Sequence, residues 1–280
     1  MSLLSTQFSG LKSIKQIINE FRLQPNKDLG QNFLLDSSIP DRMVLNAGEL
    51  AGKTVLEVGP GPGILTRSIL ASNVKKVIAV EMDPRCISAL QSLQDAASDR
   101  LFILQKDALH ANWQEITQGL KYTVIANLPY NIATQLVTTW LKNILQVEKV
   151  IVMLQKEVAQ RFCATPNCHS YGRLAVLTQA RWHAEILFDV AAEEFYPAPK
   201  VTSSVICFSP NNLTVNDELF KKVEIICATA FAHKRKMVKT GLGKLFHNAP
   251  QILEEIGARS DARAEQLDLK QYLALAEKLK

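Results

Sequence analysis

The sequence has 280 residues, of which 47% are hydrophobic and 21% are charged, and its formal net charge is +5. This is an ordinary globular composition, with enough residues for one large core or for a large domain and a small one. No apolar run reaches the roughly 18 residues of a membrane span. Residues 1–10 lack the charge and apolar stretch of a signal peptide, so we expect a cytoplasmic protein.

The five cysteines are odd in number and scattered, which argues against a disulfide framework. Cys163 and Cys168 lie near His169, but their spacing is not that of a zinc finger and no second cysteine pair follows. We therefore expect reduced thiols and no metal.

Helices and strands are expected to alternate along the first part of the chain. Apolar residues with helical spacing at 11–24 predict a first helix. Strands are expected at 53–58, 75–83, 101–107, 122–130 and 149–155, with helices at 64–72, 84–93 and 132–145 between them. Strands that are nearly all apolar and alternate with helices indicate a parallel sheet covered on both faces. Apolar runs at 184–190 and 201–208 suggest further strands, which need not be parallel.

The composition changes after Pro210, and residues 217–231 place their apolar side chains on one helical stripe. We therefore predict a catalytic domain at 1–212 and a small all-helical domain at 213–280. A cluster without neighbouring acids lies in the second: Lys234, Arg235, Lys236, Lys239 and Lys244. Taken alone, this cluster fits either a solvated face or a face that contacts phosphates.

EVGPGPG at 57–63 follows a predicted strand, where glycine allows a tight turn and close approach to a ligand. The G-x-G-x-x-G pattern is not met, and Pro60 and Pro62 lack the N–H groups that hold a pyrophosphate. The turn therefore favours a nucleoside without phosphates, such as S-adenosylmethionine.

Two acids end the next two predicted strands. Glu81 is placed to accept hydrogen bonds from ribose hydroxyls, and Asp107 to accept from an adenine amine. Either acid alone could instead be a helix N-terminal charge. The two acids, the glycine turn and NLPY all lie at the carboxyl ends of successive predicted strands. Open parallel sheets bind ligands at that edge, so together these features predict a ligand site.

NLPYN at 127–131 ends the fourth of these strands. The Asn127 side-chain oxygen, with the Leu128 or Pro129 carbonyl, could hold the two N–H groups of an adenine N6 amine and direct its lone pair at a methyl group. Tyr130 could stack on the base. The alternative is a structural proline turn with a half-buried tyrosine.

The chain resembles the ribosomal RNA adenine N6-dimethyltransferases over roughly residues 14–250. The resemblance rests on nine ordered segments: KDLGQNFLLD, EVGPGPGILT, VEMD, KDAL, NLPYNIAT, MLQKEVAQR, YGRLAV, FYPAPKVTSSV and AFAHKRK. It implies a Rossmann-like S-adenosylmethionine-dependent methyltransferase sheet, with segment 11–36 covering the cofactor. The residues it implies for the cofactor are Asn32, Leu34 (through its backbone), Gly59, Gly61, Glu81, Met82, Asp107 and Asn127. It also implies that Phe195 is a second aromatic wall for a flipped adenine.

Within the family, FYPAPKV and YGRLAV resemble the bacterial small-subunit type. That type dimethylates two adjacent adenosines in a hairpin loop near the 3′ end of 16S rRNA and has a role in subunit assembly. We expect a monomer that binds this RNA in an assembled particle and recognises its shape, with the basic cluster as RNA contacts. Two alternatives stay open: a 23S rRNA methyltransferase of the erythromycin-resistance type, and a non-catalytic nucleic-acid-binding factor on the same scaffold.

Overall fold

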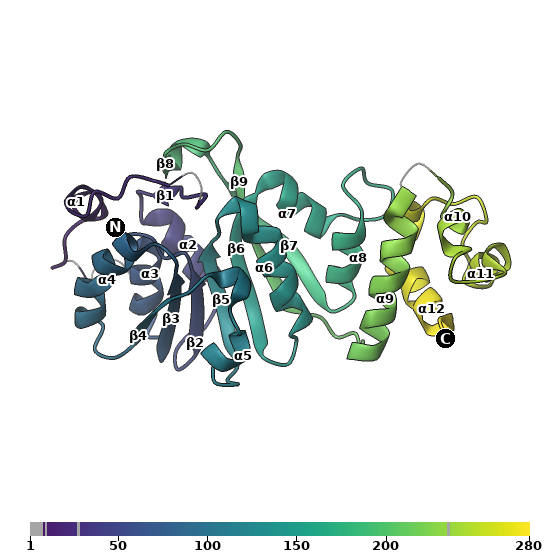
Figure 1. Cartoon of the computed structure of the whole chain (residues 1–280), viewed down its shortest axis with the longest axis horizontal. Coiled ribbons are helices and arrows are strands. Elements are labelled where there is room, and N and C mark those ends of the chain that lie inside the picture. Colours follow the sequence, from purple (N-terminus) through teal and green to yellow (C-terminus); the bar gives the residue numbers. More distant parts are fainter. Residues whose placement is uncertain (1–7, 9, 27–28, 234–235) are drawn as a thin grey trace. The chain divides into compact units, whose positions relative to one another are not determined.

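The computed structural model describes residues 8, 10–26, 29–233 and 236–280 (Figure 1). Within this part of the chain there are two compact units. The first comes from Met1–Lys156 and Ile186–Ser209, and the second from Glu157–Glu185 and Pro210–Lys280. The inclusion of 157–185 in the second unit was not predicted from the sequence.

A seven-stranded sheet has the order β4-β3-β2-β5-β6-β9-β7. Its strands are β2 (Thr54–Val58), β3 (Lys76–Glu81), β4 (Leu101–Gln105), β5 (Tyr122–Asn127), β6 (Val147–Gln155), β7 (Trp182–Val190) and β9 (Ser203–Pro210). The strands from β2 to β6 pair in parallel, and β9 pairs antiparallel with β6. The predicted strands are confirmed, and the sheet is mixed because β9 runs against its neighbour.

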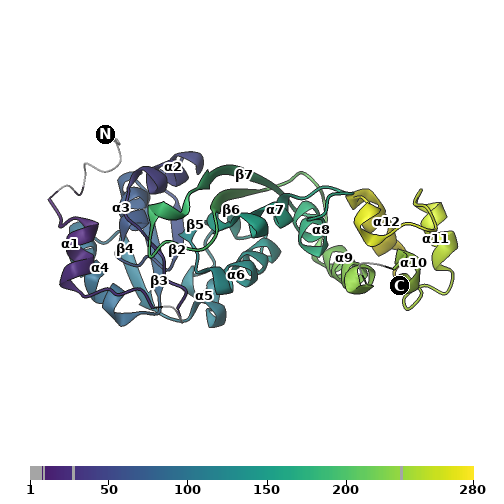
Figure 2. The same cartoon turned by 90° about the horizontal axis from the view of Figure 1, so that it is seen from above.

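Helices cover both faces of this sheet, as predicted. Figure 2 shows α2 (Ser38–Asn46) and α3 (Ile64–Ala71) on one side, and α5 (Trp113–Ile116) and α6 (Tyr130–Lys142) on the other. The helix α4 (Pro84–Ala96) follows β3, and its first turn is stabilised because Asp83 accepts a hydrogen bond from the Arg85 N–H and Pro84 needs no donor there.

The core explains why these apolar runs form strands. All five residues of β2 are buried, and Val55 and Leu56 are fully so. A strand with apolar side chains on both faces is stable only between two helical layers. Within the helical layer formed by α5 and α6, Trp113 of α5 packs on Trp140 of α6 with ring centroids 5.7 Å apart.

Four short elements of the first unit lie outside the seven-stranded sheet. The strand β1 (Phe33–Leu34) pairs antiparallel with β8 (Phe195–Tyr196), which follows the 3₁₀ turn η2 (Ala192–Glu194). The helix α1 (Ile14–Glu20) begins with a capping box between Ser13 and Gln16. The β1–β8 pair connects the N-terminal segment to the stretch of chain just before β9.

The second unit is helical around its own core. Its elements are α7 (Lys156–Cys163), α8 (Arg173–Gln179), α9 (Asp217–Ala230), η3 (Phe231–His233), α10 (Val238–Leu242), α11 (Ala249–Glu255), η4 (Ala264–Gln266) and α12 (Leu269–Lys278). The first residue of α7, Lys156, still belongs to the first unit. Phe231 stacks on Tyr272 with ring centroids 5.8 Å apart. In the described residues, no helix combines the length and apolar character that crossing a membrane requires.

Candidate active site

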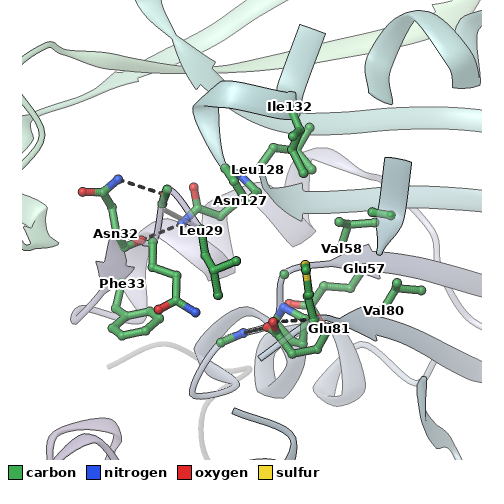
Figure 3. A pocket seen from close by; sticks show the side chains of 18 of the residues that line it. Leu29, Asn32, Phe33, Glu57, Val58, Val80, Glu81, Asn127, Leu128 and Ile132 are labelled. Carbon is green, nitrogen blue, oxygen red and sulfur yellow. Dashed lines mark hydrogen bonds between the residues drawn. The ribbon is translucent and has the colours of Figure 1, made fainter. Parts of the chain in front are cut away.

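A pocket of about 300 Å³ lies at the carboxyl ends of β2, β3, β4 and β5 (Figure 3). This is the edge at which open parallel sheets bind ligands. The sequence-predicted residues that line it are Asn32, Leu34, Gly59, Gly61, Glu81, Met82, Asp107, Asn127, Leu128, Pro129 and Tyr130. The structure therefore brings the four separate motifs to one place, and the individual roles of these residues stay predictions.

The glycine turn has the backbone shape that only glycine adopts easily. Gly59, Gly61 and Gly63 have φ values of 70°, 55° and 91°, in the left-handed region that disfavours side chains. A Cβ on Gly61 would lie 3.1 Å from the Phe33 ring, so this glycine also lets segment 29–34 approach the turn. The turn shapes the floor of the pocket.

Glu81 is held by three backbone N–H groups. Met82 and Asp83 each donate to its Oε1 at 2.8 Å, and Gly61 donates to its Oε2 at 3.2 Å. Burial raises the pKa of this carboxyl, and the three backbone hydrogen bonds oppose that shift. These bonds fix the carboxyl against the glycine turn, where its remaining acceptor positions suit ribose hydroxyls.

Asp107 lies at the more open side of the pocket. Its Oδ1 accepts from the Leu109 N–H at 2.9 Å, and its Oδ2 lies 2.8 Å from His110 Nδ1. The Leu109 hydrogen bond, followed by the His110 contact, lowers the pKa of Asp107. The residue therefore caps a 3₁₀ turn and also lines the pocket. Its contact with an adenine amine stays a prediction.

Glu57, the first residue of the EVGPGPG segment, also lies in the site, although the sequence alone predicts no role for it. It lines the pocket, is 1% exposed, and its Oε2 has no hydrogen-bond partner among the described residues. Burial, with a smaller contribution from the charge of Glu81, raises its pKa to about 8. The only available signal for it was a carboxyl two residues before the first glycine of the turn.

Segment 29–34 closes one wall of the pocket and is tied down at two points. Gln31 Nε2 donates to Asp83 Oδ2 at 3.1 Å, and Gln31 Oε1 accepts from the Asn26 N–H. Asn127 Nδ2 donates to the Asn32 carbonyl at 3.3 Å, as the dashed line in Figure 3 shows. Gln31 was also missed, because nothing local in the sequence links it to Asp83.

The NLPY turn leads directly into α6. The Pro129 carbonyl accepts from the Ile132 and Ala133 N–H groups at 3.2 and 3.1 Å, so both of its lone pairs serve the first turn of the helix. Of the two carbonyls that the sequence left open, Leu128 is therefore the better placed to accept from a ligand amine.

The two predicted aromatic residues differ in their surroundings. Tyr130 is half-buried, lines the pocket and hydrogen-bonds to Ser203 Oγ at 2.6 Å. Phe195 does not line the pocket: it is 4% exposed, belongs to the core of the first unit, and pairs through its backbone with Leu34. Its place against a target adenine stays a prediction.

The basic residues lie in the second unit. Lys236 and Lys244 are exposed and Lys239 is half-buried in α10, whereas Lys234 and Arg235 lie outside the described residues. Across the ranges that the structure describes, no group of three or more His, Cys, Asp or Glu side chains could hold a metal ion.

The pocket fits S-adenosylmethionine better than a dinucleotide. Its floor is a turn with two prolines, which lack N–H groups, and the Glu81 and Asp107 carboxyls face it, which disfavours phosphates. Because Gly61 has no side chain, the Phe33 ring can approach the turn and close the wall of the pocket there. Sheet and pocket together define an S-adenosylmethionine-dependent methyltransferase.

Comparison with known proteins narrows this class. Residues 22–280 match the family model described as ribosomal RNA adenine dimethylase, and the chain belongs to that family. It is therefore an adenine dimethyltransferase that acts on ribosomal RNA.

Its sequence is 44% identical over 269 residues to the ribosomal RNA small subunit methyltransferase A of Azorhizobium caulinodans, covering 95% of this chain and 92% of that protein. It is 40% identical over 273 residues to the protein of the same name from Rhizobium etli, covering 96% and 98%. Among solved structures, a dimethyladenosine transferase from Plasmodium falciparum superposes with a TM-score of 0.76 at 24% identity, covering 87% of this chain and 95% of that one. The 23S rRNA methyltransferase ErmE superposes with a TM-score of 0.71 at 22% identity, covering 89% and 99%. At this identity the two structures show a shared fold.

Proposed function

We propose that this enzyme dimethylates the N6 amines of two adjacent adenosines in a hairpin loop near the 3′ end of 16S rRNA, as a step in small-subunit assembly. The names of the two bacterial relatives and the FYPAPKVTSSV and YGRLAV segments support the small-subunit RNA over the 23S alternative. The non-catalytic alternative is disfavoured because the glycine turn, Glu81 and NLPY all face one pocket. We also propose that the enzyme is a cytoplasmic monomer without a metal and that its substrate is an assembled particle.

One observation carries the chemistry: the orientation of the Asn127 amide. Because Nδ2 donates to the Asn32 carbonyl, Oδ1 is the atom left to accept from a ligand. With the Leu128 carbonyl beside it, the site offers two acceptors for the two N–H groups of one amine. Two acceptors would direct the nitrogen lone pair away from both, and so leave it free to attack a methyl group.

When bound, the cofactor supplies a methyl group on a sulfonium sulfur, which is already a good leaving group. Glu81 and the glycine turn would hold this cofactor, whose methyl group would pass to the N6 lone pair while the electron pair of the S–C bond stayed on sulfur. The amine would lose one proton to solvent per transfer, and this proton becomes acidic as the bond forms, so positioning is the main task of the protein. Tyr130 contributes by stacking on the extruded base, an interaction worth about 1–3 kcal/mol.

The test is transfer of labelled methyl from S-adenosylmethionine to unmethylated small ribosomal subunits, with products identified by nucleoside mass spectrometry. We expect wild type to form N6,N6-dimethyladenosine and Asn127→Ala to lose at least about 100-fold in rate, because the amine is no longer held. Transfer to large-subunit RNA alone would favour the 23S alternative. Cofactor binding without any transfer would favour a non-catalytic role.

A further inference from the structure

A buried serine that does not line the pocket hydrogen-bonds to Tyr130 of the NLPY turn. Ser203 lies at the start of β9 and is 0% exposed. Its Oγ lies 2.6 Å from the Tyr130 hydroxyl, although the two residues are 73 positions apart in the chain. This hydrogen bond joins the wall of the pocket to the sheet.

The position of Ser203 is fixed from both sides of the strand. Its backbone pairs with Gln155 of β6, and the Lys156 N–H donates to the Thr202 carbonyl at 3.0 Å. The next residue, Ser204, donates to Asp189 Oδ1 at 2.6 Å, and the Lys156 ammonium lies 2.6 Å from Asp189 Oδ2. The Ser203 hydroxyl therefore sits on a rigid part of the sheet.

Among the described residues, Ser203 is the one hydrogen-bond partner of the Tyr130 side chain. Tyr130 begins α6 directly after Pro129, where only its backbone is held by the helix. Without a partner for the hydroxyl, the ring could turn about its side-chain torsions while the helix stayed in place. A stacking platform depends on the plane of the ring, so the hydroxyl contact controls a property that the reaction needs.

We propose that Ser203 is a positioning residue that sets the plane of the Tyr130 ring and thereby orders the target adenine. The inference deepens the proposed function and rests on it for the identity of the base. It assigns Ser203 an effect on the nucleic-acid substrate, because the serine lies outside the pocket and acts through the Tyr130 ring, which stacks on the base.

The test is a double-mutant cycle of Ser203→Ala and Tyr130→Phe, with methyl transfer to small subunits and cofactor affinity measured for each variant. We expect each single variant to lose about tenfold in kcat/KM for RNA, and the double variant to lose no more than either single. Cofactor Kd should stay within twofold throughout. Multiplicative losses in the double variant, or wild-type kcat/KM in Ser203→Ala, would overturn the proposal.

Ser68→Ala is the matched control. Ser68 is also buried, at 3% exposed, and its Oγ also makes a 2.6 Å hydrogen bond, to Asp41 within the same unit. We expect this variant to lose thermal stability while its kcat/KM for RNA stays near wild type. Equal losses of kcat/KM in both serine variants would mean that Ser203 only stabilises the fold.

A second readout separates this inference from the proposed function. A single-stranded RNA oligonucleotide with 2-aminopurine in place of adenine reports stacking by fluorescence quenching, whichever RNA is the natural substrate. We expect quenching by wild type to fall at least threefold in Ser203→Ala. If wild type methylates no small subunits but this loss is seen, the proposed function fails and the role of Ser203 stands. Unchanged quenching would overturn the role of Ser203.

Discussion

The side-chain amide of Asn127 is oriented by the main-chain carbonyl of Asn32, which accepts its Nδ2–H at 3.3 Å across 95 positions of sequence. Segment 29–34 thus does more than cover the pocket, since it determines which atom of the Asn127 amide faces the ligand.

Asn127→Asp tests this orientation more sharply than truncation. Aspartate has the same shape and keeps an oxygen for the target amine, but it cannot donate to Asn32 and would set a carboxylate against a carbonyl. We expect kcat to fall at least about 100-fold, measured by methyl transfer under saturating cofactor. Asn112→Asp is the control, because Asn112 caps α5 through its oxygen and aspartate caps equally well. Near-normal kcat in Asn127→Asp would show that donation to Asn32 is unimportant.

Gly61→Ala should weaken cofactor binding. The backbone at Gly61 has φ +55°, and an added Cβ would lie 3.1 Å from the Phe33 ring, so segment 29–34 would have to move. Gly52→Ala is the matched control, with φ +73° and no atom within 4 Å of its Cβ. We expect both variants to lose about 1–2 kcal/mol of stability from the left-handed backbone. Calorimetry should show at least a tenfold loss of S-adenosylmethionine affinity only in Gly61→Ala, and equal affinities would contradict this role.

Glu57 should make stability depend on pH. Its pKa is raised to about 8 by burial from an ordinary 4.5, so between those values the native state binds a proton that the unfolded state has lost. The free energy of unfolding should then decrease as pH rises, by about 1.4 kcal/mol per pH unit, until the curve levels near pH 8. Below pH 4.5 both states are protonated and the effect vanishes.

Denaturant unfolding of wild type and Glu57→Gln at pH 5, 6.5 and 8 measures this dependence. The glutamine variant should show the flatter profile, so its stability relative to wild type should rise with pH. Glu49→Gln, at an exposed position, should keep the wild-type profile. Parallel profiles for wild type and Glu57→Gln would show that Glu57 ionises normally in the folded protein.

Much of the fold was readable from local pattern, and parts of the site were not. The apolar run at 53–58 and the glycines after it predicted β2 and its turn, because burial between helical layers and positive φ each impose a residue type on a short stretch. The contacts of Tyr130 with Ser203 and of Gln31 with Asp83 join distant segments. No periodicity in the sequence predicts such pairs, because the residues next to a polar side chain do not show whether it contacts solvent or a distant partner.

Phe195 illustrates the same limit, because the family motif suggests an aromatic wall and the structure places the ring in the core. Phe195→Ala should cost about 3–5 kcal/mol as a cavity, which would obscure any role in binding. Phe195→Leu keeps most of the buried volume. If the ring stacks on the target base, the leucine variant should lower kcat/KM for RNA at least fivefold with cofactor Kd unchanged. Wild-type kcat/KM in Phe195→Leu would assign this residue to the core alone.

The lysines of the second unit should control the salt dependence of RNA binding. Replacing Lys236, Lys239 and Lys244 with glutamine removes three charges, one just before α10, one within it and one just after it. If each contacts one phosphate, the slope of log K against log salt concentration should become shallower by about two to three, because each contact contributes about 0.7–0.9. Filter binding of small subunits at several salt concentrations measures the slope.

Lys121→Gln, at an exposed position before β5 and at the sheet edge opposite the pocket, is the control and should leave the slope unchanged. Affinity that falls without any change in slope would mean that these lysines act through folding of the second unit, because a lost phosphate contact must reduce counterion release.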